Sequence, residues 1–238
     1  MQPTRVALAV VAVLAGCGRD GGLAAKARES GRQRADQARG AARAAGLPDD
    51  VAGVIADAAG AVGRAFTVTY DTGGGGRATL VQDPPRRRFD LAVPGSATRA
   101  TLLNEQGSFA CEQRAATWAC VPSPEPPPDV GPFAATDLER TIGSLATARA
   151  TYDLRVERRR LAGTDARCLV TERKPAAAGD PALGERGTLC VAPSGAALDI
   201  DQPSQRLTAV DYADRADPAA FALPGPLATT TVAPPPTR

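Results

Sequence analysis

Residues 66–83 read FTVTYDTGGGGRATLVQD, two alternating segments joined by a run of glycines. In the first segment Phe66, Val68 and Tyr70 occupy every second position, and this spacing puts them on one face of a β-strand. Residues 77–83 alternate in the same way after the glycine run. The stretch therefore predicts a β-hairpin with one apolar face, from which a sheet can be built outward.

Strand-like alternation recurs along most of the remaining chain. It predicts strands at about 89–93, 98–104, 108–114, 117–122, 151–161, 166–174, 186–192, 196–202 and 206–212. Apolar residues fall at helical spacing in the segments 49–64 and 136–148, and the second begins with a capping-box pattern at Thr136 and Glu139. Because most strands are apolar on one side and charged on the other, we expect an α+β fold in which about eleven antiparallel strands have one face covered by two or so helices.

The N-terminus has the pattern of an export signal. A single basic residue, Arg5, precedes the apolar run from Val6 to Leu14, which is too short to span a bilayer. The next residues, Ala15-Gly16-Cys17, resemble the lipobox of bacterial lipoproteins. The resemblance implies that residues 1–16 are removed and that a diacylglyceryl group on Cys17 anchors the chain to the cell membrane, on its extracytoplasmic face. An ordinary cleavage site followed by a chance cysteine is the alternative.

Four further cysteines remain after the anchor, an even number in a chain expected to be exported. An oxidising compartment favours two structural disulfides. The local pattern favours the pairs Cys111 with Cys120 and Cys168 with Cys190, since each pair flanks two strands expected to be adjacent, but the other connectivities stay open. The chain has no histidine and no Cys-x-x-Cys motif, so we expect no metal site, no redox pair and no cofactor.

Composition divides the chain into four parts. After the signal, residues 17–45 hold seven basic and three acidic residues, and Leu23 is their only large apolar residue. This segment is interpreted as a flexible or transiently helical basic tether, either a plain solvated spacer or one drawn toward anionic lipid headgroups. Residues 46–226 form the expected domain, and residues 227–238 read as a disordered Pro- and Thr-rich tail. Export and the absence of aromatic residues among the basic ones argue against a nucleic-acid partner.

Three local features carry a family resemblance. They are the strand and turn at Leu80–Asp90, the Cys111–Cys120 hairpin, and the ending formed by residues 209–212 and 221–224. Together with the order of elements over about residues 49–225, they resemble the LolA-like family of exported lipoproteins and lipid carriers, including the LppX and LprG type.

The resemblance implies a strongly curved, incompletely closed antiparallel sheet wrapped over helices around an apolar cavity for acyl chains. The chain would then be a lipid-binding or lipid-carrying lipoprotein, and a monomer. Residues expected to line the cavity are Phe66, Val68, Tyr70, Leu80, Phe89, Leu91, Phe109, Trp118, Ile142 and Leu145. Patterning alone does not distinguish these residues as cavity lining from the same residues as packed core.

Two other functions remain open at this point. The fold also resembles the amino-terminal domain of RseB-type envelope regulators, which implies a sensor or scaffold that binds a protein partner; a plain envelope spacer is a third reading. Catalysis has little support, because there is no histidine base and no Gly-x-Ser-x-Gly elbow. Asp199 and Asp201 lie at alternating strand positions and are interpreted as a solvated face. We therefore expect a binding protein and no enzyme.

Overall fold

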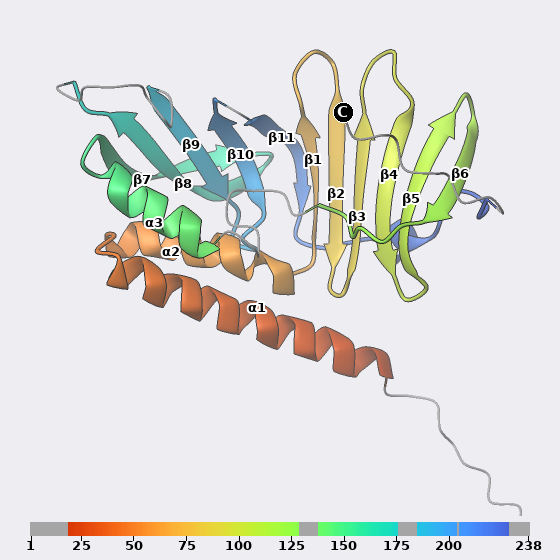
Figure 1. Cartoon of the computed structure of the whole chain (residues 1–238), viewed down its shortest axis with the longest axis horizontal. Helices are drawn as coiled ribbons and strands as arrows, with labels where there is room; N and C mark the ends of the chain where they lie inside the picture. The colour runs from red at the N-terminus through yellow and green to blue at the C-terminus, as the bar shows by residue number, and fades with distance from the viewer. Residues whose placement is uncertain (1–18, 129–137, 176–184, 204, 229–238) are drawn as a thin grey trace, which may run out of the picture.

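The computed structural model describes residues 19–128, 138–175, 185–203 and 205–228 (Figure 1). Its helices are α1 (Arg19–Ala44), α2 (Asp49–Gly60) and α3 (Leu138–Ala148), with short 3₁₀ turns η1 (Ala61–Gly63) and η2 (Pro218–Phe221). Its strands are β1 (Phe66–Asp71), β2 (Arg77–Asp83), β3 (Arg86–Ala92), β4 (Thr98–Asn104), β5 (Gly107–Arg114), β6 (Thr117–Pro122), β7 (Tyr152–Leu161), β8 (Thr164–Arg173), β9 (Arg186–Val191), β10 (Ala197–Gln202) and β11 (Gln205–Ala213).

All eleven strands belong to one antiparallel sheet in the order β6-β5-β4-β3-β2-β1-β11-β10-β9-β8-β7. The order describes two meanders, β1–β6 and β7–β11, joined where β1 pairs with β11. The sheet is open, because β6 and β7 are its edges and do not pair with each other. The predicted α+β fold with an incompletely closed antiparallel sheet is confirmed, and only β3 begins more than two residues away from its expected start.

The helices cover the β7–β10 half of the sheet (Figure 1). Helix α2 begins after Pro48 with two acidic residues in its first turn, where they suit the helix dipole, and it packs against β7, β8 and β9. The core cluster between helices and strands includes Val51 and Ile55 of α2 and Leu189 of β9. Helices α2 and α3 lie where the sequence predicts them, whereas the expected cap Thr136 is outside the described residues.

The expectation of a flexible or transiently helical tether is wrong for residues 19–44, which form the 26-residue helix α1 and pack on the domain. This helix packs against α2 and η1 through small residues: Ala38 and Ala42 are fully buried. A Cβ added at Gly31 would lie 2.6 Å from the Cα of Gly63, so the two backbones are in direct contact. Because this buried face consists of alanine and glycine, the spacing of large apolar residues in the sequence does not reveal it. None of the described helices is long and apolar enough to cross a membrane.

Both favoured disulfides are present. Cys111 and Cys120 lie directly opposite each other in β5 and β6, and Cys168 and Cys190 do so in β8 and β9. Each bond therefore joins neighbouring strands within one half of the sheet. Cys17 and most of the predicted tail, residues 229–238, lie outside the described residues.

Candidate functional site

Strand register assigns every residue of β1–β6 to one of two faces, because these six strands pair without a register shift. The face that includes Phe89 is called the Phe89 face, and its larger apolar members are Phe66, Val68, Tyr70, Leu80, Phe89, Leu91, Leu103 and Val121. The opposite one is called the Phe109 face, and its apolar members are Val81, Ala100, Leu102, Phe109, Cys111, Trp118 and Cys120.

The Phe89 face unites six of the residues that the sequence suggested as cavity lining. Val68, Leu80 and Phe89 lie opposite one another in three consecutive strands, and Tyr70 aligns with Leu91 through Ala78 of β2. The members on β1 and β2 are buried, whereas Phe89 and Leu91 on β3 keep part of their surface. The sequence therefore identifies one continuous apolar surface here.

The structure does not bring Phe109 and Trp118 to that surface, which corrects their assignment. Phe109 lies opposite Leu102, and both belong to the Phe109 face. The chain after β11 covers this face: Phe221 is buried in the same cluster, and a Cβ added at Gly225 would lie 2.6 Å from the Cβ of Trp118. Phe109 and Trp118 are thus part of a separate core that the C-terminal segment closes.

Ile142 and Leu145 are also separate from the Phe89 face. They project from α3 and are buried in the core between the helices and the β7–β10 half. The ten residues that the sequence grouped together therefore fall into three places, and six of them share the Phe89 face.

Sequence reasoning overlooked two members of the Phe89 face, Leu103 of β4 and Val121 of β6. Both keep part of their surface exposed. Leu103 pairs with Arg87 of β3, and the short turn between β4 and β5, which pairs Asn104 with Gly107, places Leu103 opposite Ser108 of β5. Turn length combined with alternation was the signal that could have found them.

The Phe89 face has no helix packed on its β3–β6 part within the described chain. Contacts of α2 with the sheet fall on β7, β8 and β9, and the C-terminal segment covers the opposite face. In the same region the hydroxyl oxygen of Thr101 is buried without a hydrogen-bond partner among these residues. Residues 123–128 cross this part of the face: the hydroxyl of Ser108 donates a 2.7 Å hydrogen bond to the carbonyl oxygen of Glu125, and Pro127 is buried (Figure 1). The result is a partly buried apolar strip formed by Phe89, Leu91, Leu103 and Val121.

Tyr70 anchors the inner end of this strip. Its side chain is fully buried, and its hydroxyl donates a 2.7 Å hydrogen bond to the carbonyl oxygen of Ala197 in β10. Burial raises the pKa of the Tyr70 hydroxyl, so the group is a neutral donor. The bond ties β1 to β10 across β11 and thus fixes the two halves of the sheet to each other. Among the described residues no cluster of His, Cys, Asp and Glu suited to a metal ion occurs.

No family model and no curated protein matches this sequence. Similar solved structures include a DUF1329 family protein from Desulfovibrio piger, with 14% identity, a TM-score of 0.18, and coverage of 60% of this chain and 67% of that one. Another is a putative outer membrane lipoprotein-sorting protein domain from Vibrio parahaemolyticus, with 10% identity, a TM-score of 0.17, and coverage of 60% and 66%.

Proposed function

We propose that this protein is a membrane-anchored lipoprotein that binds the acyl part of a lipid on the Phe89 face. The observation that supports the proposal most is the partly buried apolar strip across β3–β6, on which no described helix packs. The resemblance of the sequence to LolA-like lipid carriers points to the same class of ligand. Binding of this kind needs no catalytic group, and the chain has no histidine.

The dimensions of the strip suit an acyl chain. From β3 to β6 there are three inter-strand spacings, or about 14 Å. One leaflet of a bilayer core is about 15 Å thick, which is the length of one lipid chain. Covering apolar surface contributes about 25 cal/mol per Å², so a chain laid across Phe89, Leu91 and Leu103 gains free energy without any directional contact.

The membrane anchor is part of the same proposal and rests on the lipobox-like residues before Cys17. Helix α1 begins two residues after Cys17 and packs on the domain, so the domain would be held close to the membrane surface. Two acyl chains attach a protein durably. A domain held there would exchange lipid with the bilayer over a short distance.

The test uses two neighbouring residues of β3. Leu91 lies on the Phe89 face and Ala92 on the opposite face, so Leu91→Glu and Ala92→Glu add the same charge on different sides. We expect Leu91→Glu to weaken the binding of a fluorescent fatty acid to lipid-free protein at least about tenfold, because a carboxylate in an apolar site is costly. Ala92→Glu should bind as the unchanged protein does.

Equal binding by both variants would contradict the proposal. Thermal unfolding of each variant shows whether it is folded. If Leu91→Glu unfolds, Leu103→Glu makes the same test further from the buried centre of the sheet, because Leu103 is partly exposed.

A protein partner is a second candidate, favoured by the free edge of the sheet. Strand β7 is ten residues long and pairs only with β8 in the described structure, and such an edge can receive a strand from another protein. Arg155, Glu157 and Arg159 lie along it, and charged side chains are a common protection against edge pairing. If the function is binding of a protein partner at this edge, Leu91→Glu should leave that binding unchanged.

A further inference from the structure

A basic cleft lies where α1, η1, β11 and the turn between β9 and β10 meet. Its volume is about 880 Å³. Its charged lining consists of four arginines and one aspartate: Arg28, Arg32, Arg64, Arg215 and Asp214. The arginines come from three separate parts of the chain, namely the middle of α1, the end of η1 and the residues after β11, so no local sequence motif announces them.

Most of this positive charge is not neutralised within the described residues. Arg32 pairs with Glu29 on α1, and that pairing lowers the pKa of Glu29. Arg28, Arg64 and Arg215 make no ion pair with any other residue that the structure describes. These three exposed arginines line one hollow, and an anion bound between them would be attracted by all three charges.

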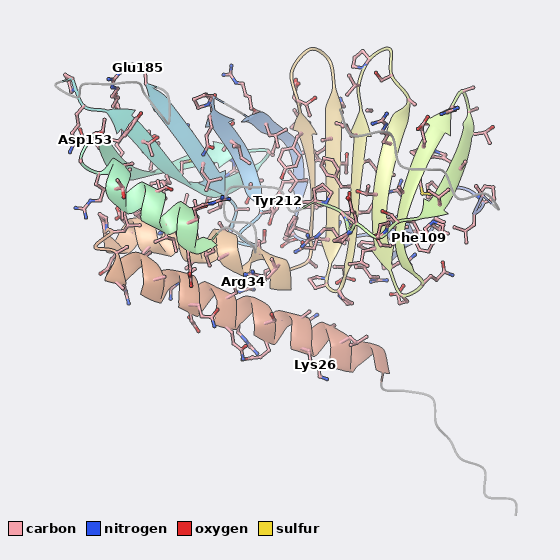
Figure 2. All side chains as sticks on the ribbon, in the orientation of Figure 1. Lys26, Arg34, Phe109, Asp153, Glu185 and Tyr212 are labelled. Atoms are coloured by element: carbon pink, nitrogen blue, oxygen red, sulfur yellow. A yellow bond between two sulfur atoms is a disulfide. The ribbon has the colours of Figure 1, made fainter. Side chains whose placement is uncertain are left out.

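Hydroxyl groups line the same cleft. The hydroxyl of Tyr212 donates a 3.0 Å hydrogen bond to Oγ of Ser194, and the amide of Ala196 donates to the same oxygen at 3.2 Å. Since Oγ of Ser194 already accepts two hydrogen bonds, its own hydrogen is left to donate to a ligand. The tyrosine ring packs against the apolar cluster that holds Phe66 and Val68. Figure 2 shows Tyr212 near the middle of the sheet, between its two halves.

A smaller adjoining hollow carries acidic groups but does not cancel the positive charge. It shares Arg32, Arg64 and Ser194 with the cleft and adds Asp36 and Asp57. Asp57 is already paired with Arg167 at 2.8 Å. Arg28 and Arg215 line the cleft but not this hollow, so they form the side of the site away from the two carboxylates.

The shape of the cleft depends on the contact between α1 and η1. Gly31 and Gly63 have no side chains, so α1 passes close enough to place Arg28 and Arg32 beside Arg64. A Cβ on Gly63 would lie 2.8 Å from the carbonyl oxygen of Ala27. The same close approach that packs the helix therefore assembles the arginines.

We propose that this cleft binds a phosphate group, carried either by a lipid headgroup or by a small soluble phosphate. Guanidinium groups form paired, charge-assisted hydrogen bonds with phosphate oxygens, and the free hydrogen of Ser194 supplies a neutral donor. The inference does not depend on the apolar strip of the Phe89 face, because inorganic phosphate has no acyl chain.

The test compares two double variants that remove the same charge. Arg64→Gln with Arg215→Gln takes two arginines from the cleft. Arg160→Gln with Arg206→Gln takes two exposed arginines from elsewhere on the surface, each within 4 Å of a carboxylate. Binding of inorganic phosphate, and separately of a short-chain phosphatidic acid below its micelle concentration, is followed by amide NMR shifts of Ser194 and its neighbours in the chain from residue 18 onward.

We expect saturable binding to the unchanged protein, at least about tenfold weaker binding to the cleft variant and unchanged binding to the surface variant. Tighter binding of phosphatidic acid than of phosphate assigns the site to a lipid headgroup, and equal binding assigns it to a soluble phosphate. Equal loss in both double variants, or no saturable shift at Ser194 with either probe, would overturn the proposal. Absence of lipid binding with phosphate binding intact would count against the lipid function alone.

Discussion

The contact between Gly31 and Gly63 shows how single glycines decide the position of α1. Gly31 is buried against backbone, whereas Gly40 on the same helix has open space around the position of a Cβ. Alanine is a better helix former than glycine by up to about 1 kcal/mol. Substituting alanine at each of the two sites therefore distinguishes the effect of helix propensity from the effect of packing.

The first prediction uses this pair. Gly40→Ala should stabilise the protein by about 0.5–1 kcal/mol, because nothing opposes the gain in propensity. Gly31→Ala should destabilise it by about 1–3 kcal/mol, because its Cβ would displace backbone atoms. Urea unfolding of both variants measures the difference. A stabilising effect at Gly31 would show that α1 does not pack on η1.

Phe109 and Trp118 show what residue patterns leave undecided. Alternation groups Phe109 with Cys111 within β5 correctly. It does not say which face of β4 they adjoin, because a shift of one residue in the pairing exchanges the two faces. Phe109 lies opposite Leu102, and its neighbour Ala110 lies opposite Thr101 on the Phe89 face. Six of the ten suggested residues share a face because they lie on β1, β2 and β3, which are joined by consecutive hairpins.

At the scale of elements, every predicted strand exists, because alternating burial is strong in an antiparallel sheet. Helix α1 was missed because its buried stripe consists of Ala38, Ala42 and Gly31, which resemble a polar linker in composition. The pattern of α2 was visible because its stripe uses Val and Ile.

Removing α1 gives the second prediction. A chain beginning at residue 46 should unfold at a clearly lower urea concentration than a chain beginning at residue 18, since it exposes the surface of α2 that Ala38 and Ala42 cover. Equal midpoints for the two chains would show that residues 19–44 are the flexible tether that composition suggested.

The third prediction concerns the ion-paired residues Arg155, Glu157 and Arg159 on β7. Hydrogen bonds from Arg155 and then Arg159 lower the pKa of Glu157 to about 2. Because the folded-state pKa is depressed, this carboxylate stabilises the fold above its ordinary pKa, and the contribution is lost as the pH falls toward 2. An NMR titration of the Glu157 carboxyl carbon measures the value directly.

Arg155→Gln should move the Glu157 pKa upward toward its ordinary value. Glu112, whose pKa is lowered by Arg114 on β5, serves as the internal control and should not move. A Glu157 pKa near 4.5 in the unchanged protein would contradict the effect of Arg155 and Arg159 on this carboxylate.

At the scale of the whole molecule, the two halves of the sheet are covered differently. Helices pack on the β7–β10 half, and the C-terminal segment packs on the Phe109 face of the other half (Figure 1). The Phe89 face of β3–β6 receives neither within the described chain and is crossed by residues 123–128. The sequence predicts the members of the Phe89 face on β1–β3, which lie in consecutive hairpins, but not Leu103 and Val121. It does not predict the basic cleft either, because Arg28 and Arg215 meet only after both meanders have formed.

The cleft and the strip lie on connected parts of the structure. Tyr212 of the cleft pairs with Val68 of the Phe89 face across β11 and β1. Arg28 is nine residues into α1 from Arg19, or about 14 Å along the helix, so an anchor at Cys17 would hold the cleft near lipid headgroups. A lipid could therefore contact both surfaces, with its phosphate in the cleft and a chain on the strip.

The most direct test of lipid binding is native mass spectrometry of residues 18–238, exported from a bacterial host behind a cleavable signal and purified without detergent. The account predicts a main species heavier than the bare chain by the mass of one lipid, and loss of that added mass in Leu91→Glu. A folded protein that carries only its own mass, even after incubation with vesicles of total bacterial lipid, would contradict it.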